Sequence, residues 1–383
     1  MKQPARATGR SRFERFADAA TFALGTVAVL RGGKRGDGAP TPVQAGAAGD
    51  SPESDPTRSP AEAHARSREP GRGREALAPT QIPWAGWKDI LTRVWKEIDD
   101  DRVLAVAAGM VFYGLLAIFP AIAALVSLYG LVADPSTISS NLNAAAGVLP
   151  SGGVQILEEQ VKRVVEQGND TLGLALIFSL ALSLWSANSG VKALFDSLNV
   201  VYDEKEKRGF VKLTLFSLTF TLGAILFIIL AFLSVVVLQI LLDFVGLGQV
   251  LEWVLAIARW PLLLLVMVGG LMVVYRYGPS RDRPRWNWLW PGAVMAAVLW
   301  LAGSLALSYY LSNFEDYSKT YGSLGAAMGF MMWLWLSTTV ILVGAELNAE
   351  IEHQTAKDTT KGPEKPLGGR GATMADSVGP AQG

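Results

Sequence analysis

Cysteine is absent from the 383 residues, and histidine occurs only twice, at His64 and His353. The absence of cysteine excludes disulfide bonds, thiol nucleophiles and thiolate metal ligands. Two histidines, both outside the apolar part of the chain, are too few for a multi-histidine metal centre within one polypeptide. We therefore expect neither a metal ion nor another cofactor.

Charge is also scarce: charged residues make up 18% of the sequence, whereas hydrophobic residues make up 50%. The charges gather in the first hundred residues, in a few loops and near the C-terminus, so that the middle of the chain is nearly uncharged. A charge at the centre of a bilayer costs roughly 3 kcal/mol or more, and this separation is therefore typical of a membrane protein. The net charge is zero, so no overall positive field predicts binding to nucleic acid.

Six apolar stretches follow one another along the chain. Each is close to or above the ~20 residues that cross the hydrocarbon core as an α-helix. The sequence therefore predicts an all-α fold, a polytopic membrane protein with six transmembrane helices. The predicted spans are about residues 103–131, 172–189, 213–242, 254–275, 289–311 and 324–345.

An amphipathic helix is predicted directly before the first span, from Trp84 to about Asp100. Tryptophans and aliphatic residues recur there at helical spacing, and Lys88, Arg93 and Lys96 hold the other side. Tryptophan on one face and cations on the other are typical of a helix that lies in the membrane interface. The alternative is an ordinary surface helix packed on protein.

Three further segments complete the predicted organisation. The connection between the first two spans, residues 134–170, is expected to carry a short exterior helix. The predicted membrane domain covers residues 83–355. Residues 1–82, rich in Gly, Pro, Ala, Ser, Arg and Glu, and residues 356–383 are predicted to be disordered tails.

Lysines and arginines indicate the orientation of the spans. They precede the first span and follow the second, fourth and sixth, whereas the connections after the third and fifth spans hold only Lys319 between them. By the positive-inside rule, both termini and both predicted tails are cytoplasmic. An even number of spans agrees with termini on one side.

Polar residues near the inner ends of the spans form a candidate cavity. Four of them follow one another at steps of three or four residues on one helix face, beginning after Trp185, and the others lie at the cytoplasmic border. The polar face of the second span is either a vestibule at the cytoplasmic mouth or an amphipathic extension at the inner interface with solvated polar groups. Glu346 and Asn348 either pair with Lys192, Arg208 or Arg276 or lie at a helix end that reaches water. The candidate cavity residues are Asn188, Lys192, Asp196, Asn199, Arg208, Arg276, Glu346 and Asn348.

Other residues have architectural roles. Pro120 is expected to kink the first span, and Pro291 to occupy a favourable position at the start of the fifth helix. Gly325 and Gly329 allow two helix backbones to approach closely. The full structural set is Tyr113, Pro120, Gly190, Tyr202, Pro279, Pro291, Gly325, Gly329 and Gly344.

Five short motifs carry a family resemblance: Tyr113–Pro120, Trp185–Gly190, Asn199–Tyr202, Tyr275–Pro279 and Gly344–Asn348. In this order they resemble the successive signatures of the YihY/BrkB membrane proteins, over about residues 84–355. The resemblance implies a bacterial inner-membrane protein with six helices and no established biochemical activity. Some members are associated with serum resistance or envelope physiology.

Members of that family have often carried the label ribonuclease BN. The residues of the chain show whether this activity is chemically feasible. A metal-dependent tRNA-processing nuclease needs a cluster of histidines and aspartates that holds zinc. With only two histidines, both outside the apolar part of the chain, the chain does not supply it, so we reject the label and expect no enzymatic activity.

Two functions remain. The first is a transporter or flippase for a lipid-like or anionic envelope molecule, and the second is a non-transporting membrane scaffold that recruits envelope partners. The expected partners are the lipid bilayer and, in the first case, a lipid or anionic small molecule. The sequence is compatible with a homo-oligomer.

Overall fold

The computed structural model describes residues 60–129, 162, 174–245, 249–313 and 323–382. All of them fall within one compact unit, Ser54–Gly383. The disorder predicted for residues 1–59 and the exterior helix predicted within residues 134–170 lie outside the described residues.

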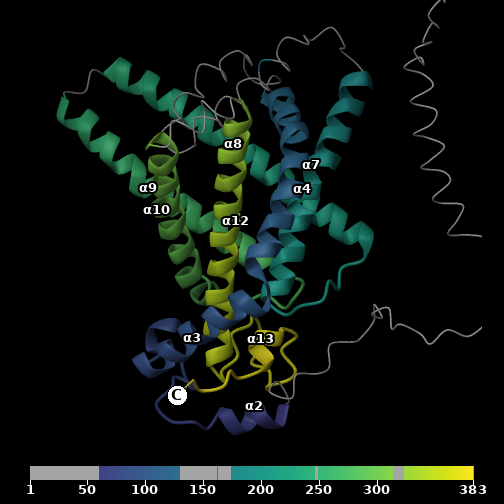
Figure 1. Ribbon diagram of the computed structural model, residues 1–383, viewed down its shortest axis with the longest axis vertical. Helices are drawn as coiled ribbons and strands as arrows, with labels where there is room; N and C mark the ends of the chain where they lie inside the picture. Colours follow the sequence, from purple (N-terminus) through teal and green to yellow (C-terminus); the bar gives the residue numbers. More distant parts are fainter. Residues whose placement is uncertain (1–59, 130–161, 163–173, 246–248, 314–322, 383) are drawn as a thin grey trace, which may run out of the picture. The chain divides into compact units, whose positions relative to one another are not determined.

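Helices are the only regular elements in the described part of the chain, which confirms the predicted all-α class there (Figure 1). A single isolated β-bridge joins Pro284 to Thr360. The elements are α2 (Pro60–Arg66), the 3-10 helix η2 (Pro79–Gln81), α3 (Trp84–Asp100), α4 (Val103–Tyr129), α7 (Leu174–Val201), α8 (Phe210–Val245), α9 (Gln249–Tyr277), the 3-10 helix η4 (Trp286–Trp288), α10 (Trp290–Asn313), α12 (Ser323–Gln354) and α13 (Thr373–Asp376).

Length and apolarity identify three candidate membrane spans among the described residues: Phe210–Ile229, Trp290–Leu311 and Ala327–Gln354. A fourth is obtained if α3 and the first part of α4, which meet at an angle of 57°, form one bent span. Each of the six predicted spans overlaps one of the six longest helices, but the count of six spans stays a prediction.

Close helix packing explains several of the small residues. α4 packs along α7, and α10 packs along α12. A Cβ added to Gly344 would stand 2.6 Å from the hydroxyl oxygen of Tyr275 and 2.8 Å from the Cβ of Ala296. A Cβ added to Gly190 would stand 3.2 Å from the Cβ of Ala117 on α4. Glycine at these positions therefore allows the backbones to approach.

The other predicted architectural residues lie as follows. The helix α4 continues through Pro120, and Pro291 is the second residue of α10. Gly325 lies in the first turn of α12, and a Cβ on Gly329, further along that helix, would stand 3.1 Å from Leu311. Three others, Tyr113, Tyr202 and Pro279, are respectively half exposed, fully buried and buried.

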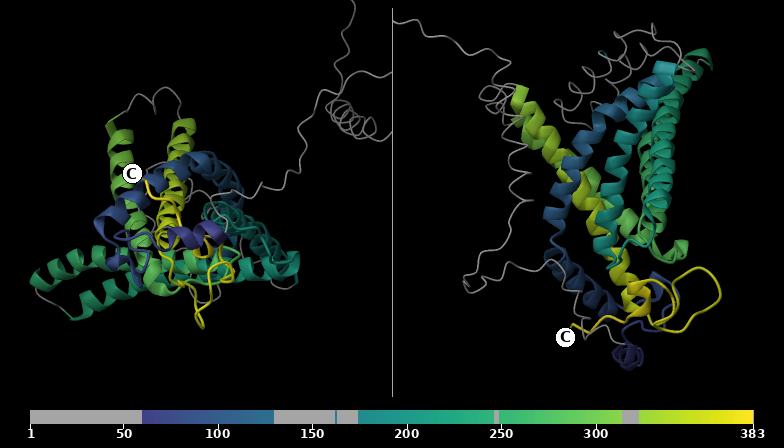
Figure 2. Two further views of the ribbon diagram at one scale, coloured as in Figure 1. Left: turned by 90° about the horizontal axis from the view of Figure 1, so that it is seen from below. Right: turned by 90° about the vertical axis from the view of Figure 1, so that its right-hand side faces the viewer.

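The C-terminal end of α12 is enclosed by segments from both ends of the chain. Figure 1 shows α2, α3 and α13 around this end, and Figure 2 shows the chain beyond α12 looping about it. Hydrogen bonds join these segments: Arg74 Nη1 donates to the carbonyl of Gln354, and Arg66 Nη1 donates to the carbonyl of Val378. Met374 of α13, 2% exposed, belongs to the same hydrophobic core as α7, α9, α10 and α12.

These contacts differ from the disorder predicted for residues 60–82 and 356–382. Polar side chains, rather than apolar runs, order the C-terminal segment. The guanidinium of Arg370 donates to the carbonyls of Lys357, Ala356, Ala375 and Lys365. The carboxylate of Asp358 accepts from the backbone amides of Thr360 and Lys365. A composition-based expectation of disorder does not register such contacts.

The helix α3 also differs in part from its prediction. Trp84, Leu91 and Trp95 are exposed, at 68%, 47% and 80%, which agrees with a face available to the membrane interface. Arg93, however, was placed among the cations on the opposite, exposed side. It is 3% exposed and forms an ion pair with Glu350 of α12, so α3 packs on protein through its other face.

Candidate functional site

A polar seam, which we define as Asn188, Lys192, Thr214 and Thr221, lies where α7 packs on α8. Thr221 Oγ1 donates to Asn188 Oδ1 at 3.3 Å, and Lys192 Nζ donates to Thr214 Oγ1 at 2.8 Å. Asn188, Thr214 and Thr221 are buried. Within the described residues no carboxylate lies within salt-bridge distance of Lys192, whose ammonium group instead lies 5.5 Å from the ring centre of Trp185.

The predicted single polar face of α7 is divided among several environments. Trp185 and Asp196 are exposed, whereas Asn188 is buried in the seam. Asn199 points to the connection after α7, where its Nδ2 donates to Glu206 Oε2 and its Oδ1 accepts from the backbone amide of Ser280. Helical spacing placed these side chains on one side of α7. It could not show that different segments of the chain pack against them and give each a different environment.

Glu346 and Asn348, near the end of α12, have other surroundings than predicted. Glu346 and Asn348 are fully buried, so this part of the helix does not reach water. The amide side chain of Asn348 bonds to the carbonyl of Leu289 and the backbone amide of Gly292, not to Lys192, Arg208 or Arg276. Neither carboxyl oxygen of Glu346 has a hydrogen-bond partner among the described residues.

Beyond Asn348, the end of α12 carries a buried ion-pair cluster, which we define as Arg93, Glu350, Arg281, Glu352 and Gln354. Arg93 pairs with Glu350, and its Nη2 also donates to Gln354 Oε1 at 2.7 Å. Arg281 pairs with Glu352 at 2.7 Å, with both side chains at most 1% exposed. Each of the two buried arginines therefore has its own carboxylate, as burial of charge requires.

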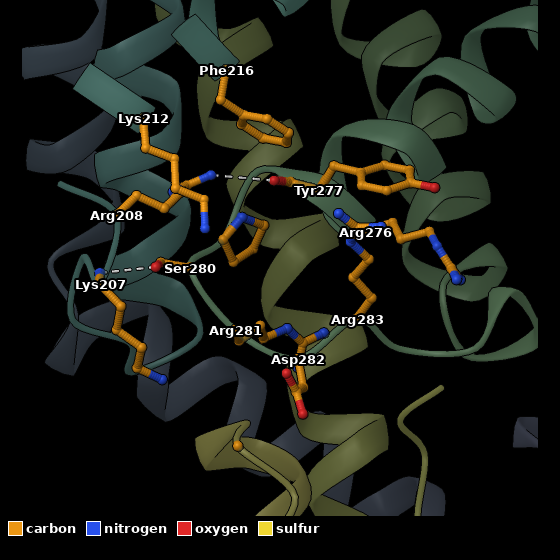
Figure 3. Close-up of a pocket in the computed structure, with 12 residues that line it drawn as sticks. Lys207, Arg208, Lys212, Phe216, Arg276, Tyr277, Ser280, Arg281, Asp282 and Arg283 are labelled. Atoms are coloured by element: carbon orange, nitrogen blue, oxygen red, sulfur yellow. Dashed lines mark hydrogen bonds between the residues drawn. The ribbon is translucent and has the colours of Figure 1, made fainter. Parts of the chain in front are cut away.

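A basic pocket lies between the α7–α8 connection, the start of α8 and the end of α9 (Figure 3). Its volume is about 440 Å³, within the ~300–1,000 Å³ of small-molecule sites. Phe216 and Tyr277 supply aromatic surface, Gly371 comes from the C-terminal segment, and the remaining wall is polar. The lining residues are Lys207, Arg208, Lys212, Phe216, Arg276, Tyr277, Pro279, Ser280, Arg281, Asp282, Arg283 and Gly371.

Three of the six cationic side chains that line the pocket have carboxylate partners outside it. Lys207 pairs with Glu204, Arg208 with Glu206 and Arg281 with Glu352, each at 2.7 Å. The lining carboxylate, Asp282, pairs with Lys365 at 2.6 Å. These pairs balance one another and leave the remaining three cations of the pocket without compensation.

Those three are Lys212, Arg276 and Arg283, and in the described structure no carboxylate lies within salt-bridge distance of any of them. Arg276 is 4% exposed, donates to the carbonyl of Pro284 and lies 4.4 Å from the ring centre of Trp286. Its Nε, also buried, lacks a hydrogen-bond partner there. Arg283 lies 4.7 Å from the ring centre of Tyr277. The pocket thus carries an excess of positive charge.

The carboxyl group of Glu206, beside the pocket, has a lowered pKa. Burial alone would raise the pKa of its carboxyl group, but hydrogen bonds from Arg208 and Asn199 lower this pKa to about 2. The negative charge of Glu206 in turn holds Arg208, whose Nη2 also donates to the carbonyl of Gly278 at 2.8 Å. This network fixes one wall of the basic pocket.

Sequence reasoning found Arg208 and Arg276 but not Lys212 and Arg283 as site residues. The signal was present, because the connections after the second and fourth predicted spans are rich in cations. In the sequence analysis these cations were used only to predict the orientation of the spans. The sequence could not show that the two connections meet around one pocket. Nor could it show that, among the described residues, carboxylates pair with three of the six cations that line it.

The ligand set for a metal ion is not assembled either. In the part of the chain that the structure describes, no group of three or more histidine, aspartate or glutamate side chains is placed to hold a metal. His353, which the sequence places outside the apolar part of the chain, is a buried residue of the last turn of α12, and its Nδ1 lies 3.4 Å from Glu350 Oε1.

The fold and the site together define a helical membrane protein with a basic pocket at one end of its long helices. A sequence profile of the family described as Virulence factor BrkB matches residues 94–367, and the chain belongs to this family of membrane proteins. This confirms the resemblance found in the five motifs.

Relatives support the same assignment. The chain is 31% identical over 250 residues to a protein of Bacillus subtilis named a ribonuclease-like protein, YfkH, covering 63% of this chain and 88% of that one. A UPF0761 membrane protein of Vibrio vulnificus is 25% identical over 259 residues, covering 66% and 79% of the two chains. Another, from Pseudoalteromonas translucida, is 23% identical over 270 residues, covering 68% and 85%. No solved structure matches the chain.

Proposed function

We propose that the protein moves an anionic, lipid-like molecule across the membrane, as a transporter or flippase. The observation that carries this proposal is Lys192, a cation in the polar seam that has no carboxylate partner among the described residues. A charge within a membrane domain is costly and commonly marks a path for a substrate or an ion. A lysine that is held only by a hydroxyl group and aromatic faces is available to a negatively charged group.

The position of the seam supports this proposal. Thr214 and Thr221 of the seam, and Lys212 and Phe216 of the basic pocket, all lie on the first turns of α8. Polar and cationic groups therefore continue from the α7–α8 contact to the pocket at the helix ends. An anion that moves from the pocket along α8 would reach Lys192 of α7, which contacts Thr214 of α8.

The proposal includes six spans with both termini in the cytoplasm of a bacterial inner membrane. The cation-rich connections that line the basic pocket are then cytoplasmic by the positive-inside rule. Because the chain has no cysteine, single cysteines introduced at Ser136 and at Gly383 can be labelled without background. We expect a membrane-impermeant thiol reagent to label the first from the periplasm and the second only from the cytoplasm. Labelling of both from one side would reject six spans.

Transport is tested with the full chain in proteoliposomes that contain a fluorescent phosphatidylglycerol. We expect the wild-type protein to move the lipid between leaflets and Lys192→Ala to abolish the movement. Lys205→Ala removes the same charge from an exposed loop position and is expected to leave transport intact.

The transport assay and crosslinking in cells distinguish the two candidate functions. Equal transport by Lys192→Ala and wild type would reject the seam as the path. No transport by a folded wild-type protein, together with a stable partner recovered by crosslinking in cells, would favour a non-transporting scaffold instead. A ribonuclease activity has no role in the proposal, because the residues that the structure describes hold no zinc-binding cluster in support of it.

A further inference from the structure

We propose that the basic pocket is a binding site for a phosphate group, the headgroup of an anionic lipid being the source that fits it best. This inference rests on the proposed function, for which it names the class of substrate. It stands on the charge, the burial and the composition of the pocket, as follows.

The charge of the pocket selects an anion. Lys212, Arg276 and Arg283 line it without carboxylate partners in the described structure, while the pocket's one carboxylate, Asp282, is already paired with Lys365. Three uncompensated cations around about 440 Å³ suit a group that bears one or two negative charges on several oxygens. A phosphate monoester or diester has this chemistry.

A buried donor without a partner marks where the anion would bind. Arg276 is 96% buried, because only 4% of its surface is exposed, yet its Nε has no acceptor within the described structure. A buried polar group without a partner is costly, by about 1–3 kcal/mol, and native proteins rarely leave one unless a ligand or water satisfies it. Its fixed position, bonded to the carbonyl of Pro284 and against Trp286, makes Arg276 a preorganised donor.

The aromatic part of the wall favours a lipid over free phosphate. Phe216 and Tyr277 lie on helices α8 and α9 beside the cations, as Figure 3 shows. Basic pockets between helices at the cytoplasmic membrane border are suited to anionic headgroups, because the acyl chains can remain in the bilayer. The exposed hydrophobic residues Phe210, Val211 and Leu215 on the same turns of α8 offer a surface for these chains.

Binding is measured on the full chain in nanodiscs of phosphatidylcholine, by titration with short-chain phosphatidic acid, short-chain phosphatidylcholine and inorganic phosphate. We expect phosphatidic acid to bind, and phosphatidylcholine to bind at least tenfold more weakly. Tighter binding of phosphatidic acid than of inorganic phosphate assigns the site to a lipid headgroup. Equal binding of these two assigns it to phosphate itself.

The variant that tests the pocket is the double substitution Lys212→Gln and Arg283→Gln, because both side chains are exposed and neither supports the fold through an ion pair among the described residues. We expect it to weaken binding of phosphatidic acid by about tenfold or more, since charged hydrogen bonds are lost. Arg276→Gln is expected to do the same, and Arg276→Lys to restore part of the affinity. Lys205→Gln, in the same connection but outside the pocket lining, is the matched control and is expected to bind as wild type does.

Wild-type affinity in the double variant, or equal affinity of the wild-type protein for phosphatidic acid and phosphatidylcholine, would overturn the proposed site. The transport assay tests the proposed function independently of the binding site. Loss of transport without loss of binding in Lys192→Ala leaves the phosphate site standing, and phosphate binding by a wild-type protein that moves no lipid would reject the transport function but not the site.

Discussion

Arginines in two neighbouring regions of the molecule have opposite surroundings. In the buried ion-pair cluster at the end of α12, Arg93 and Arg281 each meet a buried carboxylate. In the basic pocket, Arg276 and Arg283 meet none among the described residues. The same side chain therefore serves two purposes: a paired arginine holds segments of the fold together, and an unpaired one in a pocket is available to a ligand.

The largest effect is expected from a substitution in the buried ion-pair cluster. Arg93→Met removes the arginine partner of the buried Glu350 and leaves it beside the ring of His353, and removal of one partner of a buried pair costs about 3–5 kcal/mol. We expect this loss in the free energy of unfolding, followed by denaturant titration in detergent micelles. Lys96→Met, one turn along the exposed side of α3, is the control and should change stability little. A stable Arg93→Met protein would show that the pair does not hold α3 to α12.

A smaller and local effect is expected in the C-terminal segment. Arg370→Met removes the guanidinium group that donates hydrogen bonds to four backbone carbonyls, so the segment between α12 and α13 loses these bonds. We expect amide hydrogen exchange over residues 356–376 to become faster while exchange in α10 and α12 is unchanged, because such segments open independently. Lys361→Met, exposed in the same segment, should leave the exchange as it is.

The pH dependence of stability concerns the wall of the basic pocket. The pKa of Glu206 is about 2 in the folded protein, below the ordinary value of 4.5, so the ionised carboxylate stabilises the folded state. This contribution is complete above pH ~4.5 and is lost as the pH falls from there towards 2. Glu206→Gln should therefore be less stable than wild type at neutral pH, and the difference should shrink in acid. A difference that is constant with pH would contradict this role.

The smallest effect on stability is expected from substitutions in the basic pocket. The double variant Lys212→Gln and Arg283→Gln should change the free energy of unfolding without ligand by no more than about 0.5 kcal/mol per site, as is usual for exposed positions. Because these cations repel one another in the pocket, a slight gain is compatible with the account. A loss of several kcal/mol would show that both side chains support the fold.

The sequence predicted much of the fold because apolar runs and their flanking cations follow simple rules. It indicated the helical class and helices at all six predicted spans. It failed where polar contacts decide the structure. Arg370 and Asp358 order a segment that has few large apolar residues, and composition predicts disorder for such a segment.

The candidate site was predictable only in part for the same reason. Helical spacing placed Asn188 and Lys192 on one face, and both lie in the polar seam. The pairing of Glu346 and Asn348 with cations was inferred only from their predicted depth in the membrane. In the structure the side chain of Asn348 instead accepts a hydrogen bond from the backbone amide of Gly292 on α10. Which cations lack a carboxylate depends on long-range neighbours, which no spacing rule supplies.

The most direct test of the account compares unfolding with and without an anionic lipid in the wild type and in the Lys212→Gln and Arg283→Gln variant. A ligand that binds only the folded state raises its stability by RT ln(1 + [L]/Kd). The account predicts closely similar unfolding temperatures of the two proteins without lipid, and a clearly larger rise on addition of phosphatidic acid in the wild type than in the variant. An equal rise in both proteins would contradict the assignment of the basic pocket as the anion site.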